Sequence, residues 1–183
     1  MRSPTRSATI SVKDLCVLAV YGALIFAAKA ALAALPNINV NAVLIIIITL
    51  WYGWRAMYSV AVYVMLEGLI LGGGVWWFGY LYTWPLLVAI CMLFRRNDSA
   101  VIWAVIAAVF GLMFGPLMYL EYFAILGGWE MFFVMWVRGI PFDLTHCAGN
   151  FALTLALYHP LCAVMRRMLG EPKTQQQQND REP

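Results

Sequence analysis

Long apolar stretches alternate along this chain with short breaks that contain polar residues, glycine or proline. The stretches cover residues 15–35, 41–52, 56–71, 81–94, 100–120 and 141–168. A membrane-spanning helix needs about 20 apolar residues, so most stretches are long enough to cross a bilayer, while 41–52 is short. The pattern predicts an all-α integral membrane protein with six transmembrane helices.

The breaks between the stretches carry their own signals. Pro36 and Asn37 predict the end of the first helix. Three glycines at 72–74 end the third helix and predict a loop rich in aromatic residues at 76–80. Pro116 predicts a kink in the fifth helix, and Pro141 is suited to the first turn of the sixth.

Composition agrees with a membrane protein. Apolar residues make up 63% of the 183 residues and charged residues only 11%, against about 25% in a typical soluble domain. We expect a cytoplasmic lead at 1–14, one membrane domain at 15–168 and a disordered, glutamine-rich cytoplasmic tail at 169–183. The net charge of +3 is small and gives no reason to expect a nucleic acid partner.

Basic residues predict how the helices are oriented. If the N-terminus is cytoplasmic, all twelve lysines and arginines except Lys29 and Arg138 fall at cytoplasmic ends. This bias is the one expected from the positive-inside rule. It predicts that both termini lie inside the cell, which agrees with an even number of spans in a multi-pass membrane protein.

Small residues recur at helical spacing in the first apolar stretch. The four alanines concerned are Ala19, Ala23, Ala27 and Ala31. Small residues four apart allow helix backbones to approach closely within lipid. The stripe is suited either to packing within the molecule or to docking a partner membrane subunit.

Polar side chains at membrane depth gather in the outer half of the predicted bundle. They comprise Lys29, Asn37, Asn39, Asn41, Glu67, Glu121, Asp143, His146 and Asn150. Asp143, His146 and Asn150 share one helix face. Polar groups in lipid are costly unless they have a partner or a function. Aromatic residues are also more frequent on this side, which predicts an outward-facing pocket for a small organic molecule.

Simpler readings of the same residues remain open at this point. Lys29 and Glu67 can form a structural ion pair, and Asp143 can cap the sixth helix. His146 can be a buried, hydrogen-bonded histidine, and the aromatic residues can form an interfacial belt. The four cysteines form no CxxC pair and are read as buried thiols.

Signals for catalysis or bound metal are missing from the sequence. The serines lie on the cytoplasmic side, away from the histidines that would activate them. The sequence has no HExxH motif and no GxxxxGK[ST] loop. We expect no enzyme, no cofactor and no metal site, and any uphill transport needs a partner ATPase or an ion gradient.

Several blocks of residues, taken together and in order, resemble one family over about residues 12–168. They are the alanine stripe, Leu35-Pro36-Asn37, Leu66-Glu67-Gly68-Leu69-Ile70, Trp76-Trp77, Tyr80-Leu81-Tyr82-Thr83-Trp84-Pro85, and Gly139-Ile140-Pro141-Phe142-Asp143 with His146 and Asn150. The chain resembles the substrate-binding (S) subunits of energy-coupling factor (ECF) importers, which take up vitamins in bacteria.

The resemblance implies a six-helix S-component that binds a vitamin near the outer surface. It also implies docking through Ala19, Ala23, Ala27 and Ala31 onto a transmembrane T subunit that carries two ATP-binding subunits. Metal substrates are disfavoured because the chain lacks the Met-His start of the nickel and cobalt members. The branch looks closest to the cobalamin type.

Resemblance and residue chemistry together predict a set of ligand-binding residues. The set comprises Lys29, Asn37, Glu67, Trp76, Trp77, Tyr80, Arg138, Asp143, His146 and Asn150. Lys29 or Arg138 is expected to meet an anionic or carbonyl group, and the aromatic rings to stack on the ligand. The alternatives are a stand-alone secondary transporter or channel, with an ion path through Lys29, Glu67 and Asp143, and a membrane enzyme or assembly factor without a ligand.

Overall fold

The computed structural model describes residues 10–34 and 38–172. Within these ranges the chain is helical and contains no strand. The α-helices are α1 (Val12–Ala31), α2 (Asn41–Tyr52), α3 (Ala56–Leu71), α4 (Val75–Leu93), α5 (Ala100–Leu112), α6 (Phe114–Tyr122) and α7 (Gly128–Leu169). Two short segments, η1 (Gly53–Arg55) and the π-helical η2 (Phe123–Gly127), connect α2 to α3 and α6 to α7.

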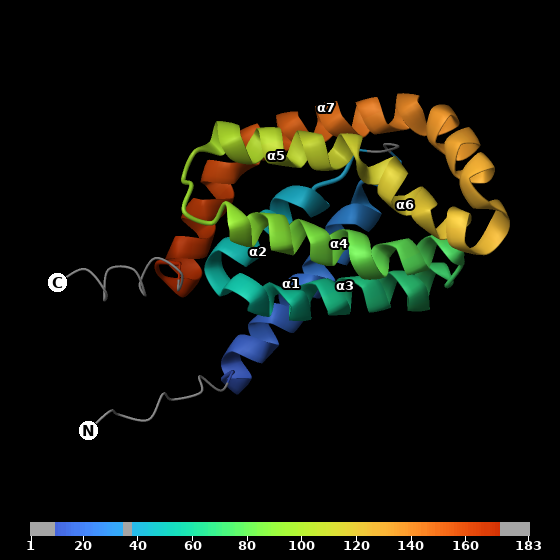
Figure 1. Cartoon of the computed structure of the whole chain (residues 1–183). Coiled ribbons are helices and arrows are strands. Elements are labelled where there is room, and N and C mark those ends of the chain that lie inside the picture. Colours follow the sequence, from blue (N-terminus) through green and yellow to red (C-terminus); the bar gives the residue numbers. More distant parts are fainter. Residues whose placement is uncertain (1–9, 35–37, 173–183) are drawn as a thin grey trace, which may run out of the picture.

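Five stretches of the described chain are long and apolar enough to cross a membrane. They are Val12–Ala31, Asn41–Leu71, Val75–Leu93, Ala100–Ile125 and Gly128–Leu169. The second stretch contains two helices, since η1 separates α2 from α3 and Figure 1 shows them running in opposite directions. The protein is therefore all-helical, with the composition of a multi-pass membrane protein.

Helix α2 forms the centre of the bundle. All twelve of its residues are buried, including the run from Ile45 to Ile48. At 1.5 Å per residue the helix is about 18 Å long, well short of the apolar core of a bilayer at about 30 Å. It ends at Tyr52, and the next residue, Gly53, has a φ of 57° that suits a residue without a Cβ. Because α2 spans only part of the bilayer thickness, side chains of other helices must line the rest of the central axis of the bundle.

Helix boundaries agree with the sequence for α2 and α3 and differ elsewhere. Helix α1 covers Val12–Ala31 and so begins and ends earlier than the predicted 15–35. The side chain of Ser11 accepts a hydrogen bond from the Asp14 N–H at 3.1 Å, a capping contact that starts the helix before the apolar stretch. The predicted helix-ending residues Pro36 and Asn37 lie outside the described residues.

The prediction of an aromatic loop at 76–80 is wrong, because helix α4 already begins at Val75. Gly72, with a φ of 83°, ends α3, and the N–H of Trp77 donates to the carbonyl of Gly74 at 3.0 Å in the first turn of α4. The indole N–H of Trp77 donates to the carbonyl of Val64 at 2.8 Å. This bond joins the start of α4 to α3. The aromatic residues at 76–80 therefore belong to a helix rather than to a loop.

The predicted fifth and sixth helices are also divided differently. Helix α5 ends at Leu112, and Pro116 lies in the first turn of the separate helix α6. Helix α7 starts at Gly128, so Pro141 lies inside it rather than at its start. The alternative reading of Asp143 as a helix cap is therefore wrong. Figure 1 shows α7 curving around one side of the bundle, which is consistent with prolines inside a long helix.

Helices α5, α6 and α7 pack closely because glycines face polar side chains. A Cβ on Gly111 would lie 2.8 Å from the amide nitrogen of Asn150, and one on Gly115 would overlap the carboxylate of Asp143. Asp143 accepts a hydrogen bond from the Gly115 N–H at 3.0 Å, and Asn150 donates to the carbonyl of Ala107 at 3.1 Å. Polar side chains of α7 therefore bind backbone groups of the neighbouring helices.

Candidate functional site

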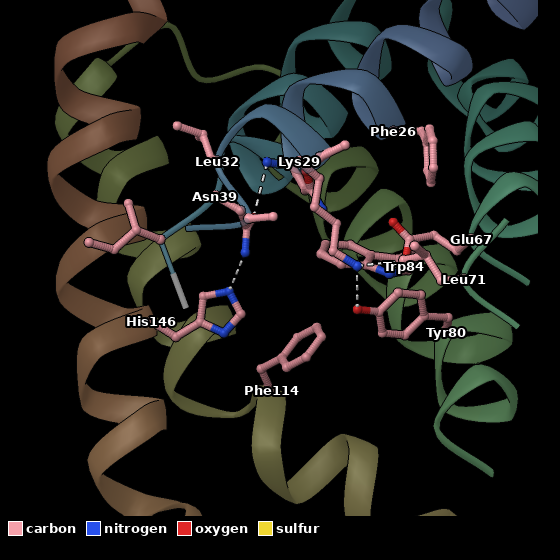
Figure 2. A pocket seen from close by; sticks show the side chains of 14 residues that line it. Phe26, Lys29, Leu32, Asn39, Glu67, Leu71, Tyr80, Trp84, Phe114 and His146 are labelled. Atoms are coloured by element: carbon pink, nitrogen blue, oxygen red, sulfur yellow. Dashed lines mark hydrogen bonds and ion pairs between the residues drawn. The ribbon is translucent and has the colours of Figure 1, made fainter. Parts of the chain in front are cut away.

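A cavity of about 360 Å³ lies where α1 ends and α2 begins. The C-terminal part of α3, the middle of α4, the start of α6 and the middle of α7 complete its wall (Figure 2). The lining residues are Phe26, Lys29, Ala30, Leu32, Ala33, Ile38, Asn39, Asn41, Glu67, Leu71, Tyr80, Trp84, Phe114 and His146. Because α2 is short, its N-terminus forms the floor of this cavity rather than filling the bundle axis.

An ion pair forms one side of the cavity. The ammonium Nζ of Lys29 lies 2.6 Å from the carboxylate Oε2 of Glu67 and donates to the hydroxyl of Tyr80 at 3.2 Å. The same Nζ lies 5.1 Å from the centre of the Tyr80 ring, within cation–π range. Glu67 is fully buried, whereas the Lys29 side chain is 27% exposed. The ion pair between Lys29 and Glu67, which is one possible reading of the sequence, is present and lies in the cavity wall.

A second polar contact lies across the cavity. The side-chain amide of Asn39 lies 3.0 Å from Nε2 of His146, and its oxygen accepts a hydrogen bond from the Asn41 N–H at 3.1 Å. This contact joins the segment before α2 to α7. The Asn41 side chain in turn donates to the hydroxyl of Tyr63 at 2.8 Å. His146 is therefore both a buried, hydrogen-bonded histidine and a cavity residue.

Aromatic rings make up much of the remaining wall. The centroids of Trp84 and Phe114 are 5.4 Å apart, those of Tyr80 and Trp84 are 5.7 Å apart, and Phe114 lies 4.8 Å from the His146 ring. These are the distances of edge-to-face and tilted aromatic pairs. Figure 2 shows the rings of Tyr80, Phe114 and His146 around the open space, with Phe26 at its edge. The rings offer flat apolar surface to a ligand.

Three buried polar atoms of cavity residues have no hydrogen-bond partner within the described chain. They are Oδ1 of Asn41, Oε1 of Glu67 and Nε1 of Trp84. Asn41 and Glu67 are fully buried, and Trp84 is 1% exposed. A buried polar atom that lacks a partner carries an energetic cost of a few kcal/mol. A bound molecule that contacts these atoms would supply the missing partners.

Four predicted ligand-binding residues line this cavity, namely Lys29, Glu67, Tyr80 and His146. The other described ones lie elsewhere. The ring centroids of Trp76 and Tyr80 are 5.3 Å apart, but Trp76 does not line the cavity. Trp77 is bonded to α3, Asp143 and Asn150 hold the contacts among α5, α6 and α7, and Arg138 is exposed. Asn37 lies outside the described residues. A ligand-binding role for these six residues stays a prediction.

Several cavity residues were not in the predicted set. Phe26, Trp84, Phe114 and the pair Asn39 and Asn41 all contribute to the wall. Helical spacing would have identified two of them, since Phe26 is one turn before Lys29 and Trp84 one turn after Tyr80. Helical spacing does not identify Phe114, because its position in the cavity wall depends on the break between α5 and α6.

Ligands for a metal are not grouped in the described part of the chain. No cluster of three or more His, Cys, Asp or Glu side chains is present there. The four cysteines are free thiols, of which Cys91 and Cys162 are buried, Cys147 is half-buried and Cys16 is exposed. The reading of all four as buried is therefore wrong for Cys16.

Comparison with protein families, curated proteins and solved structures gives no match to this chain.

Proposed function

We propose that this protein is the substrate-capture subunit of an ECF-type importer in a bacterial plasma membrane. The cavity carries the proposal: it combines aromatic walls, a paired lysine and carboxylate, and unpartnered polar atoms within a bundle of membrane helices. Small-molecule sites are usually concave, mostly apolar and furnished with a few placed polar groups. The ligand is a vitamin or a related micronutrient.

Six membrane segments with both termini in the cytoplasm are part of the proposal. The start of α1, the turn at η1, the connection from α4 to α5 and the end of α7 lie on the same side of Figure 1. Six of the eight basic residues of the described chain belong to these segments, namely Lys13, Arg55, Arg95, Arg96, Arg166 and Arg167, while Lys29 and Arg138 lie elsewhere. Because the positive-inside rule favours basic residues in the cytoplasm, we propose that this side is cytoplasmic and that the cavity lies toward the outside.

Cavity size bears on the choice of ligand. A volume of about 360 Å³ is near the lower limit for small-molecule sites, which begin at about 300 Å³. A corrinoid such as cobalamin is far larger, so this volume favours a compact ligand over the cobalamin type to which the sequence looks closest. A compact vitamin-like molecule would be in contact with the rings and the ion pair at once.

Exposed alanines support a partner subunit. Ala23, Ala27 and Ala31 are exposed along α1, and Ala19 is half-buried, so the described helices leave most of the stripe uncovered. Small side chains allow another membrane helix to approach closely. We propose that the T subunit of the importer docks here and that its two ATP-binding subunits supply the energy.

Mass spectrometry of the purified full-length protein tests this proposal. The protein is isolated in mild detergent from cells grown in rich medium, and any bound small molecule is identified. A stoichiometric vitamin-like compound and co-purification of an ATPase module are expected. An empty protein that alone carries out gradient-driven uptake in liposomes would instead establish the stand-alone transporter.

A further inference from the structure

The net charge of the cavity limits which ligands it can bind. Lys29 and Glu67 are in direct contact, so together they carry no net charge, wherever the shared proton resides. The remaining titratable group that could be cationic in the cavity wall is His146. Its protonation state therefore decides whether the site as a whole is neutral.

Hydrogen bonds assign a neutral form to His146. The oxygen of the Asn39 amide accepts from the Asn41 N–H, so the amide nitrogen faces His146. An amide nitrogen donates and cannot accept, so Nε2 of His146 must be the unprotonated acceptor. The imidazole then carries its proton on Nδ1 and has no charge. The cavity wall is neutral overall, and a charged ligand would introduce an uncompensated charge at membrane depth.

Residues of the cavity wall carry both donors and acceptors. Lys29 has three N–H groups, of which Glu67 and Tyr80 receive two, and Nε1 of Trp84 supplies a further donor. Oδ1 of Asn41 and Oε1 of Glu67 are acceptors without a partner in the described chain. A ligand that satisfies these groups needs both an acceptor, such as a carbonyl or ring nitrogen, and an N–H donor.

We infer that the ligand of this cavity is a compact, flat and uncharged heterocycle that carries an N–H donor beside a carbonyl or ring-nitrogen acceptor, as in a lactam. Its ring stacks among Tyr80, Trp84 and Phe114. Its acceptor receives a hydrogen bond from Lys29 or Trp84, and its N–H donates to Asn41 or Glu67. This inference rests on the proposed capture function and specifies its substrate class.

Three probes of matched size test the inference by equilibrium dialysis against the full-length protein in nanodiscs. They are 2-quinolinone, N-methyl-2-quinolinone, which lacks the N–H donor, and 2-naphthoate, which carries a negative charge. Empty nanodiscs correct for probe dissolved in lipid. We expect 2-quinolinone to bind about ten-fold more tightly than N-methyl-2-quinolinone, the ratio that corresponds to one well-placed hydrogen bond. We expect it to bind about a hundred-fold more tightly than 2-naphthoate, because an uncompensated charge in this site costs more than one lost hydrogen bond.

Variants of two residues extend the test. Glu67→Gln leaves the Lys29 charge uncompensated, so it should reverse the preference and favour 2-naphthoate over 2-quinolinone. Trp84→Phe should weaken 2-quinolinone several-fold. Trp103→Phe is the matched control, because Trp103 is also fully buried but donates to the carbonyl of Asn97, away from the cavity.

Other results would overturn the inference. Tighter binding of 2-naphthoate by the unchanged protein would show a site built for anions, and no binding of 2-quinolinone at millimolar concentration would exclude a lactam-type ligand. The unchanged protein decides both points even if Glu67→Gln does not fold. A charged metabolite found by mass spectrometry would refute the substrate class and leave the capture function intact. A protein that is purified without a bound molecule and binds none of the probes would contradict both the substrate class and the capture function.

Discussion

At the scale of single residues, Lys29 and Glu67 have roles in stability as well as in the cavity. Glu67 is fully buried and its carboxylate contacts Lys29 at 2.6 Å. Removal of one member of a buried pair leaves the other charge without compensation, while removal of both is much less harmful. The ion pair therefore contributes to stability, and the partly exposed Lys29 is the member that the proposed ligand would reach.

A double-mutant cycle on this pair should show strong coupling. We expect Lys29→Met to destabilise the protein by about 3–5 kcal/mol, because Glu67 is then buried alone. Lys29→Met combined with Glu67→Met should recover most of this loss. Thermal unfolding in detergent measures the effect. Additive effects of the two substitutions would show that the residues do not act as a pair.

At the scale of elements, the contact between α6 and α7 depends on a position without a side chain. Gly115 is buried, and its N–H donates to Asp143 at 3.0 Å. Phe114, the neighbouring residue, lines the cavity. The packing of these two helices therefore also fixes one aromatic wall of the site.

Substitution of Gly115 by alanine should disturb both packing and binding. The added Cβ would overlap the carboxylate of Asp143, and overpacking of this kind costs about 1–3 kcal/mol. Gly73→Ala is the matched control, since a Cβ there meets nothing within 4 Å. We expect a lower unfolding temperature and weaker ligand binding for Gly115→Ala only. Equal stability of the two variants would contradict the close contact.

At the scale of the whole molecule, the proposed topology assigns each connection to one side of the membrane. The break between α3 and α4 lies at the cavity end, and the connection from α4 to α5 lies at the end where basic residues gather. A membrane-impermeant maleimide can reach a cysteine from only one side of an intact cell.

Single cysteines in a variant without the four native ones test this assignment. We expect Gly73→Cys to react with the maleimide in intact cells and Ser99→Cys to react only after the membrane is opened. Both positions lie outside the helices, in connections between them. Labelling of Ser99→Cys from outside would reverse the orientation, and labelling of both would contradict six spans.

Docking of the proposed T subunit makes a further prediction at this scale. Ala27→Trp places a large side chain on the exposed alanine stripe of α1 and should abolish co-purification with the ATPase module. Ligand binding by the isolated subunit should be unchanged. Ala156→Trp, at an exposed alanine of α7, is the control. Loss of the module in both variants would indicate general damage rather than a docking face.

Sequence alone determined the class of the molecule. The alternation of apolar stretches and breaks predicted membrane-type helices, and it placed α2 and α3 at their observed bounds. Lys29, Glu67, Tyr80 and His146 were identified as site residues because polar and aromatic groups at membrane depth are conspicuous in an apolar chain. These features depend on local composition, which can be read along the chain.

Only the tertiary structure decided which of the candidate residues share a cavity. Asp143 and Asn150 lie on the same face of α7 as His146, yet they bind backbone groups of neighbouring helices while His146 reaches Asn39. Phe114 joins the wall because the chain changes direction between α5 and α6. The composition of the cavity wall depends on the short length of α2 and on contacts between segments that are far apart in the sequence, so a local sequence pattern cannot predict it.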